Sequence, residues 1–164
     1  MFEMTKIQGG KAAFYQELNT QLHHLLEGEP DWIANLANAA SLLYMQMEHI
    51  NWSGFYLYRD EQLILGPFMG QPACVRIPLG KGVCGTSAGN RETIVVADVH
   101  AFPGHIACDA ASRSEIVVPI LDGDRLIGVL DLDAPVAERF DDADRAGLEE
   151  FVAILNKHVD WSRF

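Results

Sequence analysis

The sequence has little positive charge and no long apolar run, and these two absences exclude several classes of partner. It contains 12 lysines and arginines against 23 aspartates and glutamates, for a net charge of -11 at pH 7. An acidic surface repels phosphate backbones and anionic lipids, so we expect no nucleic-acid and no membrane partner. No apolar run approaches the roughly 20 residues of a membrane-spanning helix. Residues 1–11 lack the apolar stretch of a signal peptide, so we expect a cytoplasmic protein.

Cysteine is scarce as well. The three cysteines, Cys74, Cys84 and Cys108, are an odd number, which argues against the disulfide framework of small secreted domains. Structural zinc sites usually contain close cysteine pairs, and the sequence has none. A zinc site would need these cysteines to converge with His100 or His105 over long spacings, so we predict no metal. The three thiols therefore remain to be explained.

Apolar sequence, in contrast, is abundant and occurs along the whole chain. The 164 residues are 49% hydrophobic, which is enough to bury a continuous core. No internal repeat, low-complexity tract or linker rich in proline and serine divides the chain. We therefore predict a single domain over residues 1–164, with residues 1–10 as a flexible N-terminal segment.

Hydrophobic periodicity predicts helices at both ends of the chain and strands between them. Apolar residues recur at three- and four-residue steps over residues 11–26, 32–49 and 141–158. Alternating or β-branched stretches predict strands over residues 52–58, 63–65, 74–78, 93–97, 115–121 and 125–132. Asp122-Gly123 predicts a hairpin between the last two strands. This order predicts an α+β fold in which helices pack on the faces of a central antiparallel sheet.

Two long predicted loops carry two of the thiols. Residues 80–90 contain four glycines and Cys84, and residues 98–114 contain Cys108. Loops of this length are uncommon inside a compact domain unless they have a function. A thiol on a loop is accessible to solvent and substrate, although free cysteine is also among the most buried residue types. Reactive thiols and small core residues both remain open as interpretations.

Three carboxylates are expected to converge at one end of the predicted hairpin. Asp131 and Asp133 alternate with leucines along one strand, so both project from the same face of the sheet. Glu115 opens the preceding strand, which the hairpin places alongside. Mutual repulsion should raise at least one pKa and create a proton donor, and the group would attract an ammonium ion. The alternative is that they are ordinary strand-end charges in water.

Six short motifs occur along the chain: NWSGFY at 51–56, IPLGKGVCG at 77–85, VADV at 96–99, FPGHIACD at 102–109, SRSEIVVP at 112–119 and GVLDLD at 128–133. Together they resemble the motifs of the free methionine-(R)-sulfoxide reductases, which are small single-domain GAF proteins. The resemblance extends over about residues 11–152, and the three cysteines in these contexts distinguish it from GAF domains in general.

The resemblance implies a role for each cysteine. Cys108 would be the catalytic thiolate that attacks the sulfoxide sulfur, releases methionine and becomes a sulfenic acid. Cys84 would resolve the sulfenic acid by forming a disulfide, and Cys74 could act as a second resolving thiol. This division agrees with general thiol chemistry, because a sulfenic acid needs a nearby thiol before it is oxidised further.

The resemblance also implies the substrate contacts and the partners. Trp52 and Tyr56 would form the pocket around the methyl end of the substrate, and Glu115, Asp131 and Asp133 would face its polar groups. The substrate would be the free amino acid, with no bound cofactor and with thioredoxin as the external reductant. The exposed faces of the first two helices could support a homodimer.

Two other functions remain to be separated from the reductase. One is a non-catalytic GAF sensor that binds a small ligand in the same pocket; thiols on both long loops argue against it. The other is an acyl hydrolase with Cys108 as nucleophile and His100 or His105 as base. A sensor should form no specific Cys84–Cys108 disulfide, and a hydrolase should give an acyl-enzyme on Cys108 and be unaffected by loss of Cys84.

Overall fold

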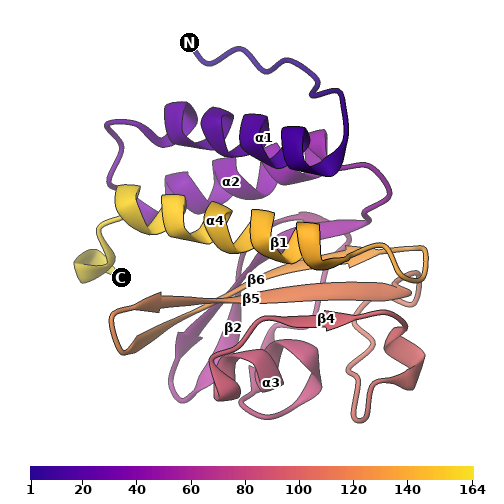
Figure 1. Cartoon of the computed structure of the whole chain (residues 1–164). Helices are drawn as coiled ribbons and strands as arrows, with labels where there is room; N and C mark the ends of the chain where they lie inside the picture. The colour runs from indigo at the N-terminus through magenta and orange to yellow at the C-terminus, as the bar shows by residue number, and fades with distance from the viewer.

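A six-stranded antiparallel sheet organises the chain, and the computed structural model describes all of it, residues 1–164 (Figure 1). The strand order is β3-β2-β1-β6-β5-β4, and every neighbouring pair is antiparallel. The α+β fold with a central antiparallel sheet is therefore confirmed. The strands are β1 Trp52–Arg59, β2 Gln62–Gly70, β3 Arg76–Pro78, β4 Ile94–Val96, β5 Ser114–Asp122 and β6 Arg125–Ala134.

Helices cover both faces of the sheet. On one face α2 (Trp32–Gln46) and α4 (Asp142–His158) lie against the strands, and α1 (Lys11–Leu26) packs over these two helices (Figure 1). On the other face lies the short helix α3 (Gly82–Asn90), which contacts β3, β5 and β6. None of these helices combines the length and the apolar character that crossing a membrane would require.

The two faces of the sheet bury two separate hydrophobic clusters. The larger cluster has 26 buried residues between the sheet and α1, α2 and α4, and the smaller has 12 on the side of α3. Each large apolar side chain that is fully buried contributes about 1.5–3 kcal/mol. The alternation along β6 divides its residues between the two sides: Leu130 and Leu132 enter the larger cluster, while Asp131 and Asp133 line a pocket on the side of α3.

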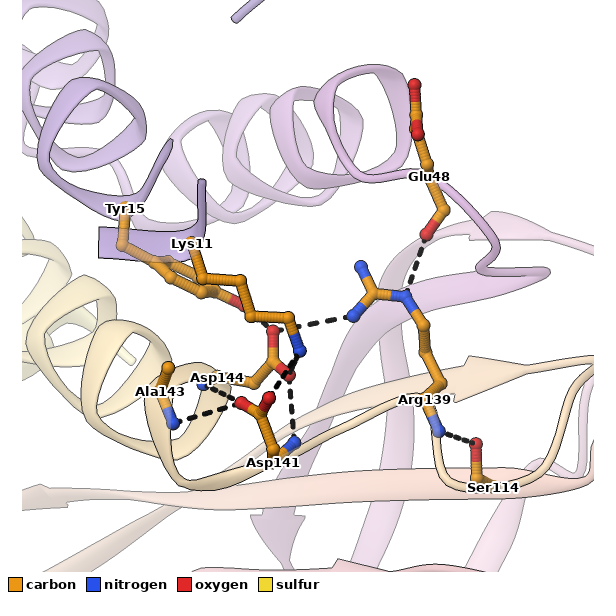
Figure 2. A network of polar contacts seen from close by, with 8 residues as sticks. All are labelled: Lys11, Tyr15, Glu48, Ser114, Arg139, Asp141, Ala143 and Asp144. Atoms are coloured by element: carbon orange, nitrogen blue, oxygen red, sulfur yellow. Dashed lines mark hydrogen bonds and ion pairs between the residues drawn. The ribbon is translucent and has the colours of Figure 1, made fainter. Parts of the chain in front are cut away.

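The first and last helices are joined at their starts by a buried carboxylate (Figure 2). The Asp144 side chain is 1% exposed and accepts a hydrogen bond of 2.6 Å from the Tyr15 hydroxyl. It also pairs with Lys11, and with Arg139 at 3.4 Å. Asp141 and Asp144 complete a capping box, in which each side chain accepts from the other residue's backbone N–H. The start of α4 is therefore fixed to α1 by ionic and capping contacts together.

Residues 1–10, which we predicted to be a flexible N-terminal segment, contain no helix or strand. Part of this segment is nevertheless attached to the helices. The backbone N–H of Ile7 donates to Gln46 Oε1, and the Thr5 carbonyl accepts from both Gln46 and Gln21. These bonds seat Thr5–Ile7 against α1 and α2, while the flexibility of the segment stays a prediction.

The prediction of a long loop over residues 80–90 is wrong, because residues 82–90 form helix α3. Gly85 is required by close packing, because a Cβ there would lie 2.3 Å from the Pro78 carbonyl oxygen. Two boundaries also differ. The α2 helix ends at Gln46, three residues before His49, which has a positive φ of 57°. Cys74 precedes β3 instead of starting it.

Candidate active site

A pocket on the α3 side of the sheet gathers most of the predicted site residues. Its walls come from β1, β5 and β6, from the start of α3, and from two loops, residues 71–75 and 102–112. Eighteen residues line it and eight of these are hydrophobic. The predicted site residues among them are Trp52, Tyr56, Cys84, Cys108, Glu115, Asp131 and Asp133.

The structure contains one disulfide bond, and it joins the two loops beside the pocket. Cys74, in loop 71–75, is bonded to Cys108, in loop 102–112, with a Cα–Cα distance of 5.4 Å. Both residues are half-buried. A bond that forms and breaks in a catalytic cycle must lie where a reductant can approach it, and two surface loops satisfy that condition.

The third cysteine, Cys84, is free and buried in α3. Its Sγ lies 3.8 Å from Glu115 Oε1. Burial, followed by the charges of Asp131 and Glu115, raises the pKa of this thiol. The thiol therefore keeps its proton at neutral pH and is a weak nucleophile.

The disulfide expected between Cys108 and Cys84 is not the one that the structure contains. Cys84 was expected on an accessible loop, but the folding of residues 82–90 into α3 buries it against carboxylates. Cys74 occupies the exposed loop that reaches Cys108 instead. The second resolving thiol of the sequence analysis is thus the one bonded to Cys108, and the catalytic roles themselves stay predictions.

The three carboxylates converge as the hairpin register predicted. Glu115 on β5 pairs directly with Asp133 on β6, and Asp131 lies two residues along β6 on the same face. Burial is the largest cause that raises the pKa of Glu115, to about 8, with the charge of Asp133 second. The pKa values of Asp131 and Asp133 are raised for the same reasons, burial first and a neighbouring carboxylate second. The repulsion expected from the sequence is therefore present but secondary.

The two aromatic residues of the pocket have a structural task that the sequence did not reveal. Trp52 and Tyr56 are buried and stacked, with ring centroids 5.9 Å apart. The indole N–H of Trp52 donates to the Gln71 carbonyl at 3.1 Å, and the Tyr56 hydroxyl donates to the Cys74 carbonyl at 2.9 Å. Both side chains therefore anchor the loop that carries Cys74. No sequence pattern indicates such bonds, because each joins β1 to a loop about 18 residues away.

Of the two histidines considered as a base for Cys108, only His105 lines the pocket. Its Nε2 atom is 3.6 Å from Glu115 Oε2, and burial lowers its pKa. His100 is exposed on the 3-10 helix formed by Val99–Ala101. The neighbour of Cys108, Asp109, accepts a hydrogen bond of 2.9 Å from the Asn51 side chain. Neither histidine is hydrogen-bonded to Cys108, whose sulfur is bonded to Cys74, so the structure contains no thiol–imidazole pair of the kind that the hydrolase interpretation requires.

One group of buried side chains has the spacing of a metal site. The ligand atoms of Cys84, Glu115 and Asp131 all lie within 4.8 Å of one another. A thiolate and two carboxylates could hold a zinc ion. Burial raises the pKa of each of the three, which favours their protonated forms. The arrangement therefore suits the storage and transfer of protons.

Comparison with known proteins settles the family. Residues 21–159 match the GAF domain family. Over 157 residues the chain is 52% identical to free methionine-R-sulfoxide reductase of Escherichia coli, covering 94% of this chain and 95% of that protein. The chain belongs to the free methionine-R-sulfoxide reductase family of GAF proteins.

Solved structures of this family share the fold closely. The structure of free methionine-R-sulfoxide reductase from Neisseria meningitidis, in complex with its substrate, is 44% identical with a TM-score of 0.93, covering 96% of this chain and 95% of that chain. The reduced form of fRMsr of Staphylococcus aureus is 55% identical with a TM-score of 0.87, covering 94% of this chain and 99% of that chain. Likeness over nearly the whole chain supports the family at the level of fold and of sequence.

Proposed function

We propose that the protein is an oxidoreductase that reduces free methionine-(R)-sulfoxide to methionine, with Cys108 as nucleophile and Cys74 as resolving thiol. One observation carries the proposal: the Cys74–Cys108 disulfide lies beside a pocket lined by buried carboxylates. The names of similar proteins, among them the E. coli reductase, supply the substrate. A sensor or a hydrolase needs neither the disulfide nor protonated carboxylic acids next to it.

The first step transfers the sulfoxide oxygen to Cys108. The Cys108 thiolate attacks the substrate sulfur while an acid protonates the sulfoxide oxygen, so a bond forms between the two sulfurs and the S–O bond breaks, releasing the oxygen as water. That water attacks the Cys108 sulfur, the bond between the two sulfurs breaks, and methionine leaves with Cys108 as a sulfenic acid. Glu115 suits the role of acid, because its pKa of about 8 keeps a proton on it at neutral pH and lies near the working pH.

The second step closes the disulfide. The Cys74 thiol attacks the Cys108 sulfenic acid, the sulfur–sulfur bond forms, and the oxygen leaves as water. A dithiol such as thioredoxin then exchanges with the disulfide, and both cysteines return to the thiol form. The sum of these steps consumes one sulfoxide and one dithiol and yields methionine, water and an oxidised dithiol, so no bound cofactor is required.

The pocket offers a complementary group for each end of a free amino acid. The Oδ1 atom of Asp131 is buried without a hydrogen-bond partner, and with Asp133 it can receive the substrate ammonium. No side chain caps the start of α3, so the backbone N–H groups there can bind the substrate carboxylate. Trp52 can provide a wall for the methyl group on the partly positive sulfur. A peptide-bound residue has neither charge, which explains a preference for the free amino acid.

A single-turnover assay tests the three cysteine roles. Reduced protein without added reductant is mixed with free methionine-(R)-sulfoxide, and methionine released per chain is counted. Wild-type protein and Cys74→Ser should each release about one equivalent, and Cys108→Ser should release none. With thioredoxin, its reductase and NADPH, Cys74→Ser should lose multiple turnover. Cys84→Ser serves as the matched cysteine control, because its thiol is free in the structure.

Methionine release by Cys108→Ser at the wild-type rate would refute Cys108 as the nucleophile. If Cys84→Ser stops thioredoxin-linked turnover and Cys74→Ser does not, Cys84 is the resolving thiol. Equal rates with the S epimer or with a peptide-bound sulfoxide would refute the proposed substrate.

The proposal also covers compartment and assembly. A cycle that ends in thiol regeneration suits the cytoplasm, where dithiol reductants are kept reduced.

The α2 helix exposes Ile33 and Met45, each more than half exposed, and such a face supports a homodimer. Light scattering after size exclusion measures the assembly directly, and a monomer at micromolar concentration would refute the dimer.

A further inference from the structure

The far ends of α1 and α4 bring two histidines face to face. His23 lies in the last turn of α1 and His158 in the last turn of α4. The Nδ1 atom of His23 and the Nε2 atom of His158 are 3.0 Å apart, although the residues are 135 positions apart in the sequence. Both lie outside the pocket, and the proposed reaction uses neither.

We propose that His23 and His158 form a binding site for a divalent transition-metal ion such as Zn²⁺. Two imidazole nitrogens bound to one ion at about 2.0–2.1 Å are separated by about 2.9–3.4 Å when the angle between them is about 90–110°. The observed separation of 3.0 Å lies in this range. The ring centroids are 4.9 Å apart and the planes are tilted by 57°, so the two rings are not stacked on each other.

The surroundings of the pair favour a cation. The α1 and α4 helices run in the same direction, because Lys11 and Asp144 meet near their starts and the two histidines meet at their ends (Figure 1). Each helix end carries about half a negative charge from its unpaired carbonyls, and here two such ends lie side by side. The carboxylate of Glu27, just after α1, adds a negative charge close to His158, and Lys157 adds a positive one.

The two histidines are open to solution on one side. His23 is exposed and His158 is half-buried, so an ion can reach both nitrogens without opening the core. Water can complete the coordination, since the Glu27 carboxylate lies 3.9 Å from His24 Nδ1, outside the pair. Imidazole is a preferred ligand of Zn²⁺, Cu²⁺ and Ni²⁺, and a surface site of this kind binds whichever of these is available.

A bound ion would hold the first helix to the last. Because the two nitrogens meet only in the folded chain, Zn²⁺ bound there stabilises the folded state by mass action. The Lys11–Asp144 pair already joins the other ends of the same helices. The predicted consequence is a protein whose melting temperature rises with added zinc.

Calorimetric titration with ZnCl₂ tests the site. The chain should carry no polyhistidine tag and should be in its disulfide form, without added thiol. Wild-type protein, His23→Gln, His158→Gln and His24→Gln are compared; His24 is the matched control, one position along α1 and outside the pair. Since outer partners of a metal ligand alone are worth about 10–100-fold in affinity, loss of either ligand should weaken binding at least about tenfold.

The expected result is therefore loss of binding in His23→Gln and His158→Gln and retention in His24→Gln. A Cys84→Ser variant separates this site from the buried Cys84 group and should still bind zinc at the histidines. Unchanged affinity in His23→Gln and His158→Gln would show that the pair is only a hydrogen bond and would overturn the proposal. Copper paramagnetic resonance provides a second readout, with hyperfine coupling to two nitrogens expected in the wild type and not in His158→Gln.

Discussion

At the scale of single residues, burial decides how the acids of the pocket hold their protons. Glu115 is 5% exposed, and desolvation is the largest cause that raises its pKa to about 8. A carboxyl group with this pKa is protonated at neutral pH and can still release its proton to a reacting oxygen. The same burial raises the pKa of the Cys84 thiol beside it, so the two neighbours remain uncharged together.

Glu115→Gln should flatten the dependence of stability on pH. In the folded protein the pKa of Glu115 is about 8, above its ordinary value of 4.5, so the folded state binds this proton more tightly. The stabilisation is fully present below about pH 4.5 and is lost as pH rises through 8. Between pH 5 and pH 8.5 the unfolding free energy of the wild type should therefore fall by at least about 1 kcal/mol more than that of the variant.

Urea unfolding at both pH values measures this difference. Glu149→Gln is the control, because its side chain is 46% exposed in α4 and should leave the wild-type slope unchanged. Identical slopes for the wild type and Glu115→Gln would mean that the Glu115 pKa is not raised by folding.

At the same scale, the sequence could identify the acids better than the thiol pair. Alternation along one strand and a two-residue turn determine which face Glu115, Asp131 and Asp133 share, and both signals are local. The pairing of Cys74 with Cys108 depends on how two loops 34 residues apart meet over the sheet. No local pattern contains that information. Only the resemblance to the family could therefore indicate which cysteine resolves the Cys108 sulfenic acid, and it indicated Cys84 as the main resolving thiol and Cys74 as the second.

At the scale of elements, strand β1 positions the resolving loop through Tyr56. Tyr56→Phe removes the hydrogen bond to the Cys74 carbonyl and leaves the ring in place. A hydrogen bond of this kind contributes about 1 kcal/mol, so disulfide formation should slow by about fivefold. The release of the first methionine should not change, because it precedes resolution.

Stopped-flow mixing with the sulfoxide, followed by timed trapping of free thiols, measures both steps. Tyr58→Phe is the control, since Tyr58 lies two residues along the same strand and makes no hydrogen bond to the Cys74 loop. Slowing of methionine release with no change in disulfide formation would contradict the anchoring role.

The contact between α1 and α4 depends on Asp144 in the same way. Asp144→Asn leaves Lys11 and Arg139 without their shared buried anion (Figure 2). Breaking a buried ion pair on one side costs about 3–5 kcal/mol. Asp142→Asn, in the same helical turn but exposed, should cost far less. Chemical denaturation of both variants checks the prediction, and equal losses would show that the network contributes little.

Element boundaries were predictable where periodicity was strong. The α1 range is 11–26 in both sequence and structure, because apolar residues face α2 and α4 at every turn. For α3 the sequence indicated no more than a possible short helix after a glycine-lined turn, since the Gly82-Val83-Cys84-Gly85 start has low helix propensity. Packing against the sheet stabilises this helix, because glycine at position 85 allows it to contact the end of β3.

At the scale of the whole molecule, the disulfide couples redox state to stability. Cys74 and Cys108 are 34 residues apart, and closing a loop of that length stabilises the folded state by ~3–4 kcal/mol in the chain-entropy description. Reductant should therefore lower the unfolding free energy of the wild type by a few kcal/mol. Cys74→Ser should already be at the lower value and should not respond.

Thermal denaturation with and without a phosphine reductant makes the comparison. Cys84→Ser keeps both bonded cysteines, so its response should match that of the wild type. A shift that disappears in Cys84→Ser would mean that the stabilising bond involves Cys84.

The side-by-side packing of α1 and α4 also determines when the protein can finish folding during its synthesis. Leu18, Leu22 and Leu26 on α1 belong to the cluster that Leu148, Phe151 and Leu155 on α4 complete. A ribosome makes α1 first, and about 115 residues must follow before α4 begins. At a synthesis rate of about 5–20 residues per second, the apolar face of α1 stays without that cover for many seconds. During those seconds the nascent chain exposes apolar surface that only the last helix can cover.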